Sequence, residues 1–400
     1  MNKELEQIPT YMSKMISDRA SLDHEIINLS IGEPFFSPPN LLYDTFKENL
    51  FQKNNYDKFP NKYSESKGAY SLRNEIARRY RRLYSAEVKT DSEILITHGA
   101  AEAIWLSILT LTSLGDEVII PDPSYTLYET AVKLLGRIPV KVSSSLKNGN
   151  CLEINELKKH VTEKTKLLII NSPENPTGAV YGEDLISKIA DFTSKNNIYF
   201  LHDEVYDAFV FSGNHINILT NYNKIPDNCL LINSFSKRYS MMGWRLGWVI
   251  AGEKIISNMT KVHTNLTLNL GVFHQDSASK ILNDQNVESE IITHRKSIEN
   301  NMIKLWTALR KIKGIKLTKK VPKAGFFLFP NISELYNIIP KKHKTHNTIG
   351  ESVAEYFLAK YKIAVVPGYI YGKCGEDCIR LVVAVKEEKI NQVIYRIENY

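Results

Sequence analysis

Short apolar runs alternate with longer amphipathic runs through the middle of the chain. Most of the short runs are continuously apolar, which is typical of strands that are covered on both faces. The longer runs, such as "EAIWLSILTLTSL" and "EDLISKIADFTSKNN", have apolar residues at helical spacing. Seven strands are predicted in this way, at residues 93–97, 116–121, 138–142, 166–171, 198–204, 229–235 and 247–252. This alternation predicts an α/β fold with a mostly parallel sheet and helices on both sides.

The two ends of the chain show a different pattern. Residues 280–313 predict one long, charged helix, followed by the strand-like runs "GIKLTKK", "GFFLFPNI" and "CIRLVVAV" and by a helix at "GESVAEYFLAKY". The N-terminal segment of about 45 residues is too short to fold alone, so it is expected to pack onto this second unit. We therefore predict a large domain over residues 46–279 and a smaller α+β domain made of residues 1–45 and 280–400.

Composition places the chain among ordinary globular proteins. It has 400 residues, of which 43% are hydrophobic and 24% are charged. No uninterrupted apolar run reaches the ~20 residues that a bilayer requires, and the first residues lack the apolar core of a signal peptide. A cytoplasmic location without a membrane partner is therefore expected.

The net charge of +7 does not by itself indicate a nucleic-acid partner, and none is expected. Lysines are spread along the whole chain and mixed with acids, and the densest basic run, "PKKHKTH", is predicted to be a solvated loop. Of the four cysteines, Cys374 and Cys378 are separated by "GED", which is not the usual spacing of a zinc site. We expect reduced, unpaired thiols and no metal site.

Candidate functional groups follow the predicted strands. Ligands of open parallel sheets bind beyond the carboxyl ends of the strands. After the first strand, "HGAAEAIW" is a small-residue turn that opens a helix, and the free N–H groups of a helix start can bind an anion. The later strands are followed by an amide, an acid, a phenol, a hydroxyl and two cations: Asn175, Asp203, Tyr206, Ser234, Lys237 and Arg245.

Each of these groups has an ordinary structural interpretation when it is taken alone. An aspartate after a strand often caps a helix, a lysine in a loop is usually solvated, and a Pro-Thr-Gly sequence usually forms a turn. The groups nevertheless fall at the same edge of one sheet. Their convergence predicts an active site around Lys237.

The stretch "SFSKRYSMMGWRLGW" resembles the cofactor-lysine motif of class I/II aminotransferases, which are fold-type I pyridoxal-phosphate enzymes. Further motifs of that family follow in order along the chain: "INLSIGEPFFSPP", "KYSESKGAYSLRNEIARRY", "THGAAEAI", "PDPSYTLYE", "NSPENPTG", "HDEVYDAF", "KAGFFLFP", "VVPGYIYG" and "CIRLVVA". The resemblance implies an aspartate-aminotransferase-like fold with a seven-stranded sheet. It also implies a pyridoxal 5'-phosphate-dependent aminotransferase that moves the amino group of an L-amino acid to a 2-oxo acid by a ping-pong mechanism.

The resemblance also implies roles for residues around the cofactor ring. Lys237 would form the Schiff base with the cofactor and transfer the α-proton. Asp203 would hold the ring nitrogen protonated. Asn175 and Tyr206 would hydrogen-bond to the phenolic oxygen, and Tyr125 would stack on the ring.

A second group of residues is similar to the family's phosphate site. Ser234 and Arg245 would bind the phosphate, together with the backbone N–H groups at Ala100 and Ala101. Tyr63 matches the tyrosine that reaches the phosphate of the neighbouring subunit, so the resemblance implies a homodimer with shared active sites.

On the substrate side, the resemblance implies Gly32, Asn175 and Arg380, with Arg380 clamping the α-carboxylate. Relatives specific for dicarboxylates place a second cation near the substrate side chain. Here "HGAAEA" has Ala101 at one such position, and "HTNLTLNLGVF" contains no arginine or lysine at the other. Because an unpaired buried carboxylate is costly to desolvate, we expect a neutral substrate, either aromatic or a larger aliphatic amino acid.

Two residues within the motifs carry expectations of their own. Glu174 occupies a place that more often holds asparagine; it would either add a negative charge near the site or, as we favour, be a surface acid. His202 directly precedes Asp203, so in a strand it should face the opposite way. We interpret His202 as a packed group behind the site.

Two other functions stay open at this point. A pyridoxal-phosphate-dependent lyase or cyclase would use the same lysine, acid and arginine. A transcriptional regulator built on this fold would need a DNA-binding module ahead of the sheet, but only about 45 residues precede "TFKENLFQKN", without a helix-turn-helix pattern.

Overall fold

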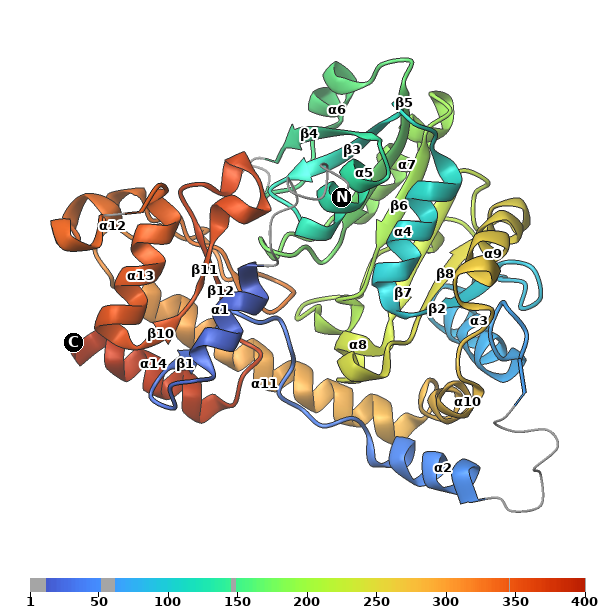
Figure 1. Cartoon of the computed structure of the whole chain (residues 1–400), viewed down its shortest axis with the longest axis horizontal. Coiled ribbons are helices and arrows are strands. Elements are labelled where there is room, and N and C mark those ends of the chain that lie inside the picture. Colours follow the sequence, from blue (N-terminus) through green and yellow to red (C-terminus); the bar gives the residue numbers. More distant parts are fainter. Residues whose placement is uncertain (1–11, 52–61, 145–148, 345, 400) are drawn as a thin grey trace, which may run out of the picture.

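The computed structural model describes residues 12–51, 62–144, 149–344 and 346–399. Figure 1 shows a large sheet with its helices beside a smaller group of elements that contains described segments from both the N-terminal and the C-terminal parts of the chain, while the long helix α11 (Gln285–Leu309) runs beneath both. Within the described residues, no helix combines the length and the apolar character that crossing a bilayer requires.

The central sheet has seven strands in the order β2-β8-β7-β6-β5-β3-β4. All strands are parallel to their neighbours except β8, which is antiparallel to both β2 and β7. The strands are β2 (Ile94–Thr97), β3 (Glu117–Asp122), β4 (Ile138–Ser143), β5 (Thr165–Asn171), β6 (Tyr199–Asp203), β7 (Cys229–Ser234) and β8 (Gly247–Ala251). The seven predicted strands and the mostly parallel sheet are therefore confirmed.

Helices cover both faces of this sheet, as the continuous apolar runs predict. Successive residues of a strand point to opposite faces, and in β2 the side chain of Leu95 joins one buried cluster while Ile94 and Ile96 join another. The helices of this part are α3 (Tyr70–Tyr84), α4 (Gly99–Leu111), α5 (Thr126–Leu134), α6 (Ile154–His160), α7 (Glu183–Lys195), α8 (Phe235–Arg238) and α9 (Glu253–Thr267).

The N-terminal segment is joined to the C-terminal part by backbone hydrogen bonds. Strand β1 (Ile27–Asn28) pairs in parallel with β10 (Ile363–Ala364), and the two lie side by side in the smaller group of elements in Figure 1. A separate three-stranded sheet has the order β11-β12-β9. Its strands are β9 (Phe327–Leu328), β11 (Val366–Pro367) and β12 (Ile379–Val382). The helices of this part are α1 (Met12–Ala20), α12 (Ser333–Ile338), α13 (Ile349–Tyr361) and α14 (Glu387–Asn399). Helix α2 (Asn40–Phe51) instead packs on α10 (Val272–Ile281).

Three predictions for the C-terminal region need correction or refinement. The single helix expected over residues 280–313 is wrong, because Asp284 accepts hydrogen bonds from the N–H groups of Asn286 and Val287 and begins α11 as a new helix. "GIKLTKK" forms no strand; one isolated bridge joins Lys316 to Asn331. "PKKHKTH" includes a single 3-10 turn over Lys341–His343 whose two lysines are exposed.

Candidate active site

The predicted lysine lies at the edge of the sheet where the parallel strands end. Lys237 follows β7 within the short helix α8, and its Nζ donates a hydrogen bond to the carbonyl oxygen of Gly32 at 2.9 Å. Burial lowers the pKa of Lys237 to about 8; the charges of Arg380 and Arg245 add to this, while Glu33 opposes it. The unprotonated share of this amine near neutral pH is therefore far larger than that of an exposed lysine.

Asp203 is the last residue of β6, and its carboxylate is 2% exposed. Its Oδ2 accepts a hydrogen bond from the phenol of Tyr128 at 2.7 Å, and its Oδ1 accepts one from the N–H of Val205 at 3.1 Å. Burial raises the pKa of Asp203 to about 6, and these two hydrogen bonds counter the rise. The acid is thus mainly a carboxylate at neutral pH, and the sequence analysis did not identify Tyr128 as its partner.

Asn175 and Arg380 meet although they come from distant parts of the chain. Asn175 follows β5 and its Oδ1 accepts a hydrogen bond from Arg380 Nη1 at 3.1 Å. Arg380, on β12, also donates from Nη2 to the carbonyl oxygen of Ser30. Its guanidinium lies 4.9 Å from the ring centre of Phe327 and 5.2 Å from that of Tyr371. The cation is therefore held rigidly, with aromatic surfaces beside it.

The start of α4 forms a cradle beneath Arg245. Gly99 has a φ of +73°, and a Cβ there would lie 2.6 Å from Nη2 of Arg245. A Cβ on Gly247 would lie 2.7 Å from the carbonyl carbon of Gly99. Arg245 Nη2 donates to the carbonyl oxygen of His98 at 3.3 Å. Glycine at these positions therefore lets the guanidinium approach a helix start whose N–H groups point outward.

The hydroxyl of Ser234 lies at the end of β7, beside Lys237. Its Oγ accepts a hydrogen bond from the N–H of Ser236 at 2.8 Å and thereby caps α8. A serine hydroxyl that accepts one bond still has its proton to donate. Ala100 and Ala101 lie in the first turn of α4, so their N–H groups have no carbonyl partner within the helix.

The predicted aromatic residues differ in their surroundings. Tyr206 is buried and packs edge-on against Phe326 and Phe327, with ring centres 5.1 and 5.4 Å apart. Tyr125 is half-buried at the start of α5. Tyr63 is 82% exposed, and no hydrogen bond or ring contact joins its side chain to the described part of the chain. The fold of a single chain therefore does not bring the side chain of Tyr63 to the cluster.

The expectations for Glu174 and His202 have different outcomes. Glu174 as a surface acid is wrong: its side chain is 1% exposed and accepts a hydrogen bond from the hydroxyl of Thr177. Burial raises the pKa of Glu174 to about 8, so it is largely neutral and adds little negative charge. His202 is fully buried as expected, and burial lowers its pKa to about 4.

Buried charges that the sequence analysis did not single out fix the elements carrying Asp203 and Lys237. Glu204, next to Asp203, accepts hydrogen bonds from His215 at 3.0 Å and Asn217 at 2.7 Å. Arg238, next to Lys237, pairs with Asp207 at 3.4 Å and with Glu288 at 3.3 Å. The positions of Glu204 and Arg238 next to Asp203 and Lys237 were the one sequence signal for these two residues. Their partners could not be identified in this way, because they lie 11 to 50 positions away in the chain.

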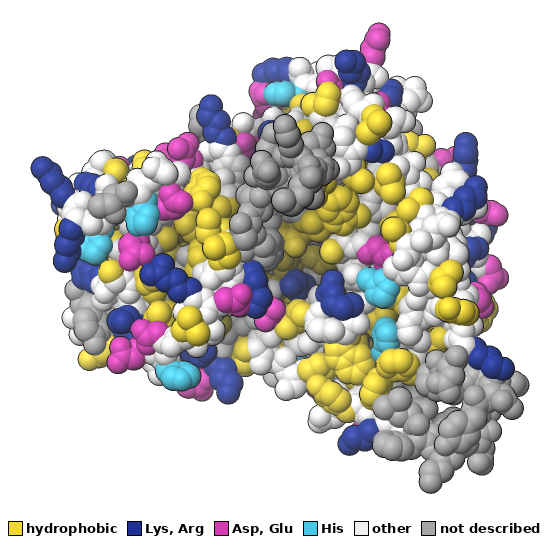
Figure 2. Space-filling model, in the orientation of Figure 1, with side chains coloured by type: hydrophobic (Ala, Val, Ile, Leu, Met, Phe, Trp, Pro, Cys, Tyr) yellow, Lys and Arg dark blue, Asp and Glu magenta, His cyan; other side chains and the backbone are white. Residues whose placement is uncertain are grey.

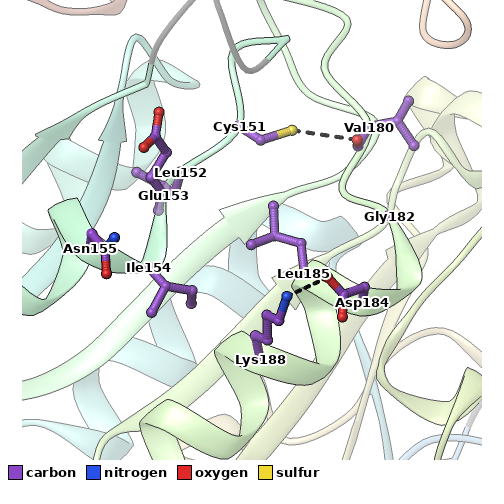
Figure 3. Close-up of a pocket in the computed structure, with 10 residues that line it drawn as sticks. All are labelled: Cys151, Leu152, Glu153, Ile154, Asn155, Val180, Gly182, Asp184, Leu185 and Lys188. Carbon is purple, nitrogen blue, oxygen red and sulfur yellow. Dashed lines mark hydrogen bonds and ion pairs between the residues drawn. The ribbon is translucent and has the colours of Figure 1, made fainter.

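Figure 2 shows one face of the molecule, which is hollowed between the sheet and the smaller group of elements; hydrophobic side chains line the hollow, with Lys and Arg side chains near its rim. A different groove of about 510 Å³ lies between the segment before α6 and the start of α7 (Figure 3). It shares no residue with the cluster around Lys237, and its Lys188 is paired with Asp184 at 2.6 Å.

Within the described ranges, no three His, Cys, Asp or Glu side chains are grouped to hold a metal ion.

Comparisons with known proteins agree with the motifs. The family model of aminotransferase class I and II matches residues 24–397. An aspartate aminotransferase of Pyrococcus horikoshii is 32% identical, with 95% of this chain and 92% of that protein covered. An aromatic-amino-acid aminotransferase 2 of Thermococcus litoralis is 31% identical, with 100% of this chain and 97% of that protein covered. The solved structure of an aromatic aminotransferase from Pyrococcus horikoshii superposes with a TM-score of 0.84 at 33% identity, covering 96% of this chain and 97% of that chain. The expected fold is thereby confirmed.

Proposed function

The chain belongs to the class I and II aminotransferase family, and we propose that this aminotransferase uses pyridoxal 5'-phosphate to carry an amino group from an L-amino acid to a 2-oxo acid. The relatives named above are described as aminotransferases, which favours transfer over the lyase or cyclase alternative. The domain boundaries and the cytoplasmic location stay predictions.

The residues present fit this cofactor. A phosphate suits the cradle of Arg245, Ser234 and the start of α4, because Gly99 and Gly247 let the guanidinium and strand β8 pack closely against the helix start, whose free N–H groups can bind an anion. Each carboxylate oxygen of Asp203 accepts one hydrogen bond and keeps a lone pair for a further donor, which suits a protonated ring nitrogen. Asn175 and Tyr206 would hold the phenolic oxygen, and Tyr125 would cover the ring face.

Lys237 carries the proposal. When bound, pyridoxal phosphate supplies an aldehyde that links to amines and a ring that accepts an electron pair. The amine of Lys237 is held 2.9 Å from the carbonyl oxygen of Gly32, and burial lowers its pKa to about 8. Once free, its Nζ takes the α-proton of the substrate and returns it, and the partly buried site keeps water from competing for that proton.

Arg380 orients the substrate. Its guanidinium would receive the α-carboxylate through two parallel hydrogen bonds, which aligns the α-proton with Lys237. Asn175 and the rings of Phe327 and Tyr371 hold this guanidinium in place. Gly32 belongs to the N-terminal segment of the chain, and its carbonyl oxygen contacts Nζ of Lys237.

We propose a neutral substrate, either an aromatic or a larger aliphatic amino acid. Neither Ala101 nor residues 263–273 supply the second cation that a side-chain carboxylate would need. Glu33 adds a negative charge whose field reaches Lys237 and would repel an acidic side chain. Among the relatives, the name of the Thermococcus litoralis enzyme agrees with this choice, while that of the Pyrococcus horikoshii aspartate aminotransferase points the other way.

We also propose a homodimer with shared active sites. Tyr63 presents its ring to solvent, and Leu266 and Leu268, near the end of α9, are 64% and 50% exposed. A second copy covering this surface would bury these apolar side chains and bring the phenol of Tyr63 to the partner's phosphate. A fully active monomer in sedimentation experiments would contradict this arrangement.

The function is tested by loading the purified protein with pyridoxal phosphate and adding single amino acids without an acceptor. Conversion of the bound cofactor to its amine form, followed by absorbance, reports the first half-reaction for each amino acid. In a second assay, of steady-state turnover with one common 2-oxo acid acceptor, we expect phenylalanine, leucine and methionine to react faster than aspartate. Aspartate leading by tenfold or more in kcat/KM, about 1.4 kcal/mol in the barrier, would overturn the substrate proposal.

A further inference from the structure

Tyr128 makes a buried hydrogen bond to Asp203. Its phenol oxygen lies 2.7 Å from Oδ2, and both side chains are almost completely buried. The other carboxylate oxygen accepts the N–H of Val205, and the charge of Lys237 stabilises the carboxylate only weakly. Two uncharged donors, one of them Tyr128, therefore compensate the negative charge of Asp203 in the protein itself.

Helix α5 connects this phenol with the ring-covering position of the site. Tyr125 caps the start of α5, Tyr128 follows one turn later, and the N–H of Tyr128 donates to the carbonyl oxygen of Tyr125 at 3.2 Å. The two rings stand edge to face, with centres 5.6 Å apart and an interplanar angle of 88°. One short helix thus carries both Tyr125, which would cover the cofactor ring, and Tyr128, which bonds to the acid that would face the ring nitrogen.

We propose that Tyr128 is a positioning residue that keeps Asp203 a carboxylate and aims it at the ring nitrogen of the cofactor. A hydrogen bond donated to a carboxylate stabilises its charged form and weakens its hold on a proton. The proton between Asp203 and the ring nitrogen then stays on nitrogen, where its positive charge draws electrons from the reacting carbon. This inference rests on the proposed function, because it assumes that the ring nitrogen meets Asp203.

Burial and the neighbouring charges favour the protonated form of Asp203, so the hydrogen bond from Tyr128 is needed to keep it a carboxylate. Burial raises the pKa of Asp203 to about 6; Glu204 raises it further, while Lys237 lowers it only weakly. Burial and the charge of Asp203, with smaller contributions from Tyr125 and Tyr206, hold the pKa of Tyr128 well above its usual range. Tyr128 therefore stays protonated and remains a donor wherever Asp203 is ionised.

The first test compares Tyr128→Phe with the wild-type holoenzyme. Phenylalanine keeps the buried ring and removes only the hydroxyl. Tyr222→Phe is the matched control. In the wild type, the phenol of Tyr222 donates a hydrogen bond to the carboxylate of Asp191 at 3.2 Å, outside the site. With ¹⁵N-labelled pyridoxal phosphate, we expect a protonated ring-nitrogen signal in the wild type and the control, and a shift toward the unprotonated signal in Tyr128→Phe. The kcat should fall about tenfold, the size of a hydrogen bond to a charged group, with KM for the amino acid nearly unchanged.

A second test uses the full chain without cofactor. Because the pKa of Asp203 is raised in the folded state, its protonated form contributes stability below about pH 3.8 that is lost as pH rises through about 6. Removing the phenol raises the pKa of Asp203 further. In Tyr128→Phe, the fall of stability with rising pH should therefore continue to a pH roughly one unit higher than in the wild type. The stability penalty of Tyr128→Phe should therefore be larger at pH 8 than at pH 4.5.

The outcomes separate the two proposals. If the penalty of Tyr128→Phe is independent of pH and its ring-nitrogen signal matches that of Tyr222→Phe, the phenol only packs and the inference is wrong. If the wild type does not bind pyridoxal phosphate, the proposed function fails and the positioning role fails with it. In that case the cofactor-free titration still shows whether Tyr128 stabilises the charge of Asp203.

Discussion

Asn175 and Arg380 are separated by 205 positions in the chain, yet Oδ1 of Asn175 accepts a hydrogen bond from Nη1 of Arg380 at 3.1 Å. The contact joins the turn after β5 to strand β12, and so connects the sheet to the smaller group of elements. In the proposed function, one side chain of this pair faces the cofactor and the other faces the substrate carboxylate. Substrate binding would therefore be felt directly at the cofactor ring.

Replacing Arg380 with lysine should weaken substrate recognition while leaving the cofactor bound. Lysine keeps the charge but loses the planar fork, so we expect kcat/KM to fall roughly 10- to 100-fold, the size of one charged hydrogen bond. Steady-state kinetics with phenylalanine measures this. Arg310→Lys is the matched control, because Arg310 also lies over an aromatic ring, that of Trp306 at 4.6 Å, but on the surface. Equal kcat/KM in the two variants would contradict the role of Arg380.

Replacing Lys237 with alanine should abolish both the covalent cofactor link and the proton transfer. Loss of a general base alone typically lowers the rate by ~10²–10⁴. We expect the visible absorbance of the linked cofactor to disappear and turnover to fall by at least this factor. Lys188→Ala, which removes a surface lysine paired with Asp184, should leave both unchanged. Wild-type turnover and spectrum in Lys237→Ala would disprove the central assignment.

Replacing Gly99 with alanine should weaken cofactor binding more than it destabilises the fold. Its φ of +73° makes any side chain strained, and the new Cβ would lie 2.6 Å from Nη2 of Arg245. Gly115 is a matched control, because its φ is +80° and a Cβ there meets no atom within 4 Å. Both variants should lose about 1 kcal/mol of unfolding free energy through backbone strain. Only Gly99→Ala should also raise the dissociation constant of pyridoxal phosphate, by roughly tenfold or more; similar constants in both variants would count against the phosphate cradle.

Replacing Glu174 with glutamine should change how stability depends on pH. The pKa of Glu174 is raised from 4.5 to about 8 by burial, so its neutral form contributes stability that is present below about pH 4.5 and lost as pH rises through about 8. We expect the unfolding free energy of the wild type to fall over this range more steeply than that of Glu174→Gln. Glu163→Gln, on an exposed acid, is the control and should behave like the wild type. Parallel curves for all three proteins would show that Glu174 is ionised throughout.

The succession of strands and helices along the chain was decided by the sequence itself. Strands that helices cover on both faces must be apolar throughout, so the seven short apolar runs identify β2 to β8 without any knowledge of their partners. The chemistry around Lys237 was also readable, because chemically distinct groups follow strands whose ends must lie at one edge. A local signal for the start of α11 was present too: Asp284 is a favourable N-cap residue, although the charged run around it suggested one continuous helix.

Tertiary structure alone decided which of these groups touch and how strongly they are charged. The burial of Glu174, the hydrogen bond from Tyr128 to Asp203 and the pairing of Asn175 with Arg380 join residues from separate elements. No local pattern encodes such contacts, since they depend on how the sheet and the smaller group of elements pack. The protonation of a buried carboxyl follows from the solvent it loses and the donors it meets, and both are properties of the packed fold rather than of the neighbouring sequence.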